Sequence, residues 1–245
     1  MAKQRRAWTY VRANAFDVAL LQETGDPRPQ LGDHWSSVIW RPMPGDPALA
    51  RTRFGCAVIG GSLTLEEYRP EEAYPWLRAL GGSVTIARSI GSPAWFASVH
   101  AYAGKIAENL LDAYPWEDVP VSTPNGTVWE TDVIPFELHR LFAGKTYIWG
   151  GDLNSAEIMD DQGFVGGNRK LRQIWHKAGS RDLRRRFFED EQQTFYAPNR
   201  RPYQLDHVFA DAVTEARVAD WRVDTEPVTA QPSLSDHAPI WVDLL

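Results

Sequence analysis

The sequence predicts an α+β fold, a four-layer α/β sandwich in which two mostly antiparallel β-sheets pack on each other between flanking helices. Short runs of β-branched and aromatic residues recur along the whole chain, and such runs are typical of strands. Only a few stretches with helical spacing interrupt them, whereas a parallel sheet requires regular alternation of strands and helices. The 245 residues contain no repeat, linker or low-complexity tract. Residues 1–245 are therefore expected to form a single domain.

Nine runs are expected to be strands because they combine β-branched or aromatic residues with turn-forming residues at their ends. In chain order they are Asp17–Glu23, Ser36–Arg41, Cys56–Gly60, Ser83–Arg88, Trp95–Tyr102, Tyr147–Asn154, Gln204–Ala210, Arg217–Val223 and Pro239–Leu244.

Three stretches place apolar residues three or four positions apart, which predicts amphipathic helices. They are Gln4–Ala15, Ile134–Lys145 and Arg169–Ala178. The third has further end signals, because Asn168 can cap its N-terminus and Gly179 follows its last residue.

Composition and charge exclude several classes of protein. Apolar residues make up 43% of the chain and charged residues 24%, which are ordinary globular values and argue against disorder. The single cysteine, Cys56, excludes an internal disulfide and a Cys-rich zinc site. No stretch approaches the roughly 18 apolar residues of a membrane span, and no apolar segment follows the basic start. A monomer with a cytoplasmic location and no membrane partner is expected.

The net charge of −6 argues against a surface uniformly attractive to nucleic acid. A local basic patch is still compatible with that charge. The segments Arg181–Arg186 and Asn199–Arg201 could supply one. The alternative is that the first is a solvated helix end and the second a loop.

Polar side chains lie where several predicted strands end. Glu23 closes the apolar run DVALLQE, and an acid at the end of a buried strand needs a cationic partner or a capping role. Asp152 and Asn154 follow two glycines and are two residues apart, so on an extended chain their side chains face the same way. Together they suit holding a water and a phosphate oxygen, although an Asx-turn would use the same residues.

Histidines and acids also fall together in the second half of the chain. Asp206 lies within the apolar run YQLDHVFA and needs a hydrogen-bond partner, which a histidine or nearby backbone could provide. Asp236 and His237 precede Pro239, which favours a bend at which both side chains can converge. His100 ends the strand WFASVH, where a satisfied core histidine is the commoner role.

In this order the motifs LLQE, VH, GDLN, LDH and SDHAPIW resemble the endonuclease/exonuclease/phosphatase superfamily over residues 17–245. The resemblance implies that Glu23 is the principal metal ligand, and that Asp236 is a second ligand or an acid close behind it. Mg²⁺ or Mn²⁺ is the expected cofactor because these ligands are oxygens, whereas zinc prefers His or Cys.

The resemblance also implies roles in phosphoester hydrolysis. Asp152 would align or deprotonate the attacking water, and Asn154 would contact the scissile phosphate. His237 would act as an acid–base or phosphate-stabilising residue whose tautomer Asp206 fixes. His100 would contact the phosphate as well.

The chain departs from the superfamily pattern at its start. Members begin with a strand that carries an asparagine near the metal, and here the helix Gln4–Ala15 starts almost at Met1. The first strand is therefore expected to be missing, and its loss would leave neighbouring strands with unpaired edges. A misplaced start, and so an N-terminally incomplete domain, is expected in preference to a divergent member.

The expected substrate is a phosphoester, with DNA the first choice and a nuclease the first function. In the tract QTFYAPNRRPYQLDHVF, Tyr196 and Tyr203 flank Arg200 and Arg201, and such a group could stack on bases and hold phosphates. It could equally be a loop that packs on the sheet edge. The alternatives are a phosphatase or phosphodiesterase of a small or lipid-linked phosphoester, and an inactive scaffold of the same fold.

Overall fold

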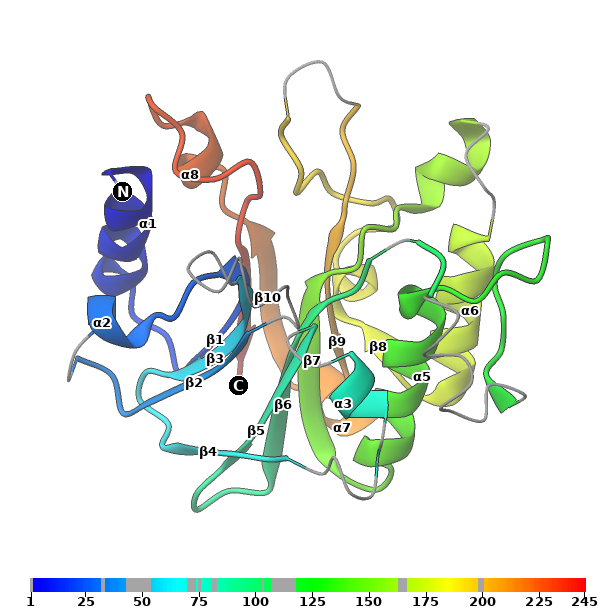
Figure 1. Cartoon of the computed structure of the whole chain (residues 1–245), viewed down its shortest axis with the longest axis horizontal. Coiled ribbons are helices and arrows are strands. Elements are labelled where there is room, and N and C mark those ends of the chain that lie inside the picture. The colour runs from blue at the N-terminus through cyan, green and yellow to red at the C-terminus, as the bar shows by residue number, and fades with distance from the viewer. Residues whose placement is uncertain are drawn as a thin grey trace.

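The computed structural model of the chain describes residues 2–31, 34–42, 54–69, 74, 76–80, 83–102, 104–106, 118–162, 167–197 and 201–245. Two β layers face each other, with helices outside both of them (Figure 1). The expected sandwich of packed sheets flanked by helices is thus confirmed. None of the described helices combines the length and apolar character that crossing a bilayer requires.

The larger layer is a sheet of six strands in the order β4-β5-β6-β7-β9-β8. Its strands are β4 (Leu65–Glu67), β5 (Val84–Ser89), β6 (Ala94–His100), β7 (Thr146–Asp152), β8 (Arg181–Asp182) and β9 (Asp206–Ala210). Neighbours are antiparallel except β6 and β7, which run parallel. Because β6 and β7 point the same way, their last residues, His100 and Asp152, lie at the same edge of the sheet.

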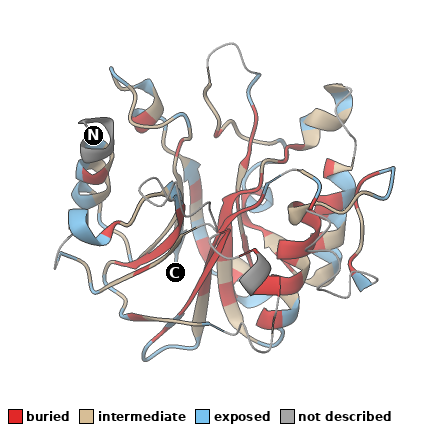
Figure 2. Ribbon diagram, viewed as in Figure 1, coloured by how far each residue is buried: buried red, intermediate tan, exposed pale blue. Residues whose placement is uncertain are grey.

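Helices α5 (Glu130–Phe142) and α6 (Asn168–Ala178) cover one face of this sheet. Their apolar faces pack on Val84, Ile86, Val99 and Trp149 in the largest cluster of buried residues. Figure 2 shows this burial as continuous red along the central strands and the adjoining helix α5. Burying an aliphatic side chain of this size contributes about 1.5–3 kcal/mol, so this face holds much of the stability that fixes the central strands.

The opposite face carries two smaller sheets rather than one. They have the strand orders β1-β3-β2 and β10-β11, and their strands are β1 (Val18–Thr24), β2 (Ser37–Pro42), β3 (Gly55–Gly60), β10 (Val218–Val223) and β11 (Ile240–Leu244). Ile148 of β7 packs against the apolar clusters under both sheets, so both lie on one face of the large sheet. Helix α1 (Ala2–Ala13) covers the outer face of the first sheet through Trp8.

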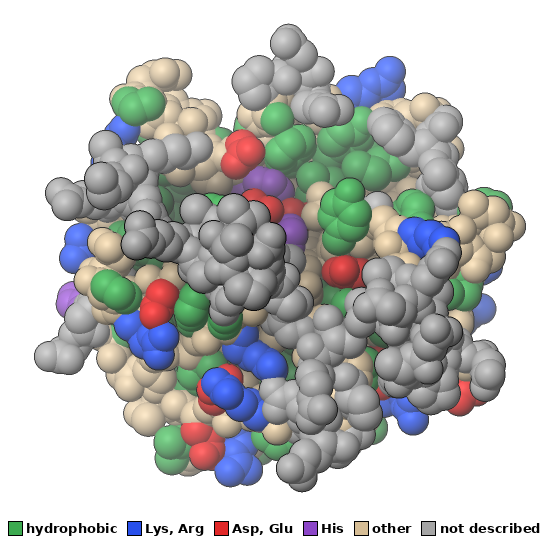
Figure 3. Space-filling model, viewed as in Figure 1, with side chains coloured by type: hydrophobic (Ala, Val, Ile, Leu, Met, Phe, Trp, Pro, Cys, Tyr) green, Lys and Arg blue, Asp and Glu red, His purple; other side chains and the backbone are tan. Residues whose placement is uncertain are grey.

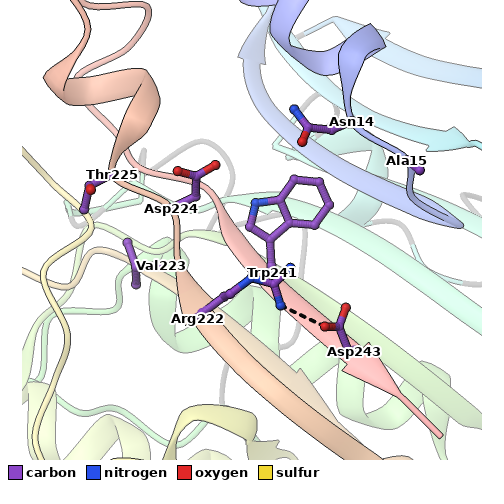
Figure 4. A pocket seen from close by; sticks show the side chains of 8 residues that line it. All are labelled: Asn14, Ala15, Arg222, Val223, Asp224, Thr225, Trp241 and Asp243. Carbon is purple, nitrogen blue, oxygen red and sulfur yellow. Dashed lines mark hydrogen bonds and ion pairs between the residues drawn. The ribbon is translucent and has the colours of Figure 1, made fainter.

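Among the edge strands of this second layer, β1 and β11 each have one side without a partner in the described part of the chain. β1 pairs with β3 alone, and β11 pairs with β10 alone. The apolar residues of β1 and β11 are half-buried or, at Leu244, exposed, whereas every residue of β3 is buried. A pocket of about 420 Å³ lies between the segment that joins α1 to β1 and strands β10 and β11 (Figure 4).

All nine expected strands are present, with ends that differ by at most two residues. The three expected helices are present too, although α5 begins at Glu130 rather than at Ile134. Its start is set by Asp132, whose carboxylate accepts the Trp129 N–H at 2.9 Å. The shorter elements have too few residues to show a period; they are β4, β8, α2 (Arg28–Leu31), α3 (Trp76–Ala79), α7 (Ala212–Ala216), α8 (Glu226–Thr229) and the 3₁₀ turns Glu157–Gln162 and Leu183–Arg186.

The prediction that Asn168 caps α6 is wrong. Gly167 is the N-cap, and Asn168 is the first helical residue. The carboxylate of Asp160 instead accepts the backbone N–H groups of Gly167, Asn168 and Arg169 at 3.0–3.1 Å. The cap therefore comes from a turn eight residues earlier. At the other end Gly179 has a φ of 103°, as expected of a left-handed C-terminal stop.

Arginines of the segment Arg181–Arg186 bind internal acceptors, although Arg185 and Arg186 are exposed. Arg184 is buried and donates to the carbonyls of Phe188 and Glu189. Arg185 and Arg186 bind Glu157 and the Glu215 carbonyl. These hydrogen bonds stabilise the turn. A guanidinium bound to internal acceptors has fewer donors left for an external phosphate. In the second basic segment, Asn199 and Arg200 lie outside the described residues and Arg201 is exposed.

Candidate active site

The register of three adjacent strands aligns three of the expected site residues. His100 of β6 pairs with Asp152 of β7, and Asp152 pairs with Asp206 of β9. Paired residues on neighbouring strands have side chains on the same face, so the imidazole and the two carboxyl groups form one row across the sheet. Histidine and acidic side chains accordingly gather near the centre of the face shown in Figure 3.

His237 joins this row from the loop before β11. Its Nδ1 lies 2.8 Å from Oδ2 of Asp206, and its ring packs on Phe195 with centroids 5.0 Å apart. Burial lowers the pKa of His237, but the hydrogen bond and charge of Asp206 outweigh burial and raise the pKa to about 9. The imidazole is therefore a cation at neutral pH, and it can donate a proton or a hydrogen bond to an anionic group.

Asp152 lies between the two histidines. Its Oδ2 is 4.0 Å from Nε2 of His237 and 3.7 Å from Nε2 of His100. Its side chain is 8% exposed, and burial followed by the charge of Asp206 raises its pKa to about 7. A carboxyl group with this pKa can accept a proton at neutral pH, which is what a general base requires.

His100 contacts the acid of the opposite layer. Its Nε2 lies 3.4 Å from Oε1 of Glu23, and its Nδ1 is buried without a hydrogen-bond partner among the described residues. Burial lowers the pKa of His100, while the charge of Glu23 acts in the opposite direction. The contact between Glu23 and His100 thus joins the two layers, and the Glu23 side chain is 64% exposed.

The backbone is unusual at Glu23 and Asn154. With φ of 49° and 47°, they are the only non-glycine residues with positive φ in the described part of the chain. Glu23 lies where the pairing of β1 with β3 shifts register. Asn154 donates its backbone N–H to Oδ1 of Asp152 at 2.8 Å. Left-handed geometry costs roughly 1–2 kcal/mol per residue, and such strain concentrates at functional sites.

Two residues that sequence analysis did not single out, Gln22 and Ser98, link the two layers. Gln22 donates its side-chain N–H to Oγ of Ser98 at 2.9 Å, and Ser98 donates to the Leu21 carbonyl at 2.8 Å. This pair joins the end of β1 to β6 and thereby places Glu23 opposite His100. The available signal was the two-residue spacing of Ser98 and His100, which puts both on the same face of one strand.

The donors fit a magnesium-type ion better than zinc. No group of three His, Cys, Asp or Glu side chains converges as a ready metal cage within the described residues. Glu23 offers an exposed carboxylate, and Mg²⁺ is commonly held by one or two carboxylates together with water and substrate phosphate. Asp236 is exposed and lies beside His237 in sequence. No hydrogen bond or ion pair joins Asp236 to Glu23 in the described part of the chain, whereas Glu23 lies 3.4 Å from His100.

In the described part of the tract QTFYAPNRRPYQLDHVF, the ring of Tyr203 is buried and so is not open to stacking on bases. Tyr203 is 8% exposed and packs with Ala156 and Leu205, and its hydroxyl donates to Gln162 at 2.7 Å. Its ring therefore belongs to a small core, as the alternative of a packed loop predicted. Tyr196 is half-buried and is the one tyrosine of the tract with an accessible ring.

No family model and no curated protein matches the sequence. Solved structures do match along nearly the whole chain. The 3′ phosphatase NExo from Neisseria, bound to product DNA hairpin, has a TM-score of 0.69 and 16% identity, with 100% of this chain and 95% of that chain covered. An AP endonuclease from Archaeoglobus fulgidus has a TM-score of 0.68 and 16% identity, with 99% and 95% covered.

A third match is the AP endonuclease LMAP from Leishmania major, with a TM-score of 0.64, 16% identity, and 98% and 82% of the two chains covered. At these identities the similarity concerns the fold. The two-layer architecture of the chain agrees with these structural matches. The chain has the fold of the endonuclease/exonuclease/phosphatase superfamily.

Proposed function

We propose that this chain is a divalent-metal-dependent phosphoester hydrolase that cleaves DNA phosphodiesters. The observation that carries the proposal is the row of His100, Asp152 and Asp206 across adjacent strands, completed by His237 and faced by Glu23. It combines a candidate base, a cationic imidazole and an exposed carboxylate within one site. The AP endonucleases among the structural matches support a nuclease.

The charge of each residue indicates its role in the proposed hydrolysis. Asp152 accepts the proton of the attacking water. His237, held by Asp206, donates a hydrogen bond or proton to the phosphate or the leaving oxygen. The amide of Asn154 and the ring of His100 bind phosphate oxygens. Mg²⁺ or Mn²⁺ held at Glu23, with Asp236 as a further candidate ligand, would supply positive charge that offsets the developing negative charge.

Cleavage of supercoiled plasmid tests this function. The purified chain should nick plasmid in Mg²⁺ or Mn²⁺ and stop when EDTA removes the metal, because the positive charge that the metal would supply to the phosphate is then lost. Intact plasmid together with turnover of a small phosphoester would favour a phosphatase, which the net charge of −6 also suits. Inactivity on both substrates, in a folded protein and also in an N-terminally extended chain, would favour a scaffold.

We also propose that full activity depends on a further strand between β1 and β11. α1 covers the sheet that contains β1 and leads directly into it, as the helix of a strand–helix–strand unit does. A strand ahead of α1 would occupy the open edge of β1, and Glu23 ends β1. A chain extended by an alternating apolar and polar segment before Ala2 should melt several degrees higher than one extended by glycine and serine. Equal melting and equal turnover would refute this dependence.

A further inference from the structure

A buried cluster behind the active-site row links the turn after β7 to the start of β9. Its central residue, Arg172 of α6, is 6% exposed, although arginine is rarely buried. Nη2 of Arg172 donates to the Ser155 carbonyl at 2.6 Å and lies 2.7 Å from Nε2 of His207. In the described part of the chain, neither side chain has a hydrogen bond or ion pair with a side chain of the row, and neither has a part in the proposed chemistry.

The cluster holds the residue that follows Asn154 from several sides. The Ser155 carbonyl accepts from Arg172 and lies 3.0 Å from Nε2 of His207. The Ser155 hydroxyl donates to Oδ1 of Asn168 at 2.6 Å, and Asn168 is bound to Asp160. Ser155 therefore has almost no freedom, and its neighbour Asn154 is kept in the left-handed conformation described above.

The same cluster reaches the other side of the site through Gln204. The Gln204 amide lies 3.1 Å from Nδ1 of His207 and donates to the Asp206 carbonyl at 3.2 Å. Asp206 is the residue that holds His237. The chain Asn154–Ser155, His207, Gln204, Asp206 thus spans from the candidate phosphate contact to the acid that holds the imidazole.

The cost of the cluster argues against a purely stabilising role. Nε and Nη1 of Arg172 are buried without hydrogen-bond partners among the described residues, and the nearest carboxylate, Glu191, is 3.9 Å away. Stacking of the guanidinium on Trp175 at 4.7 Å offsets part of this cost. Apolar residues commonly replace buried charges without loss of stability. Burying the Arg172 guanidinium therefore costs stability, and a role in positioning the site would explain that cost.

We propose that Arg172 and His207 are positioning residues, which set the distance between Asn154 and the Asp206–His237 pair by holding the Ser155 carbonyl. The proposal rests on the proposed function for its effect on turnover. Its structural part, the rigidity of residues 152–156, does not depend on that function. Misplacement of a reacting group by about 1 Å can cost about a hundredfold in rate, which sets the scale of the expected effect.

The test compares Arg172→Met with Arg184→Met. Arg184 is a matched control because it is also buried, but its hydrogen bonds go to Asp182, Phe188 and Glu189, outside both segments. Arg172→Met should lower kcat about tenfold to a hundredfold with little change in KM. It should also speed amide hydrogen exchange at Leu153 and Asn154, whose N–H groups are bonded to Leu205 and Asp152. Arg172→Lys should recover part of both.

Equal effects of the two arginine variants on exchange and on kcat would overturn the proposal, as would unchanged exchange in Arg172→Met. If Arg172→Met does not fold, His207→Gln removes the second contact to Ser155 and should give the same local exchange pattern. An inactive wild-type chain would refute the proposed function alone, because hydrogen exchange still decides whether the cluster holds the turn.

Discussion

Replacing Asp152 with Asn is expected to lower turnover about a hundredfold to ten-thousandfold, the range that a general base contributes. The Asn side chain has the same shape and can still accept the Asn154 N–H, but it cannot accept the proton of the attacking water. Initial rates on plasmid or on a small phosphodiester measure the loss. Asp161→Asn is the matched control, since Asp161 is exposed and bound to Arg169 at the surface.

Stability should move in the opposite direction in the same variant. The pKa of Asp152 is raised to about 7 in the folded chain, mainly by burial and then by Asp206, against an unfolded value of roughly 3.9. Its ionisation therefore destabilises the fold progressively as pH rises from about 4 to 7. In metal-free buffer at pH 8, Asp152→Asn should melt no lower than the wild type. A loss of activity below tenfold, or a clearly lower melting temperature, would contradict this account of Asp152.

Gly151→Ala should abolish folding or cost at least about 3 kcal/mol, as severe overpacking does. A Cβ at this position would lie 1.9 Å from the Val99 carbonyl and 2.7 Å from Nε2 of Gln22. Its φ of 144° is also unfavourable for any residue with a side chain. The glycine lets β6, β7 and the end of β1 approach closely, which is what brings Glu23 to His100. Chemical denaturation measures the loss.

Gly91→Ala is the matched control for that prediction. Gly91 has a φ of 94°, and a Cβ there meets nothing within 4 Å. This variant should lose only the roughly 1–2 kcal/mol that left-handed geometry costs, and it should keep its activity because the turn is remote from the row. Similar losses in both variants would show that backbone conformation, and not close packing around Gly151, is what the glycine provides.

The sequence predicted local structure well where the pattern was long enough. The nine strand runs and three amphipathic helices are all present, because side-chain alternation and helical spacing are properties of neighbouring residues. It also singled out Glu23, His100, Asp152 and Asp206 as polar residues at strand ends or within an apolar run. In the structure these residues lie together. Polar groups in such places need partners, and this requirement can be recognised before the partners are known.

Contacts between distant segments were decided only by the tertiary structure. The register of β6, β7 and β9 placed His100, Asp152 and Asp206 in one row, and no local pattern encodes that pairing. Packing likewise put Tyr203 in a core and buried Arg184 and Arg172. The cap of α6 came from Asp160 across a turn. The strand register, the burial of these side chains and the helix cap depend on which segments pack together in the folded chain. The same side chain is solvated or buried according to what packs against it.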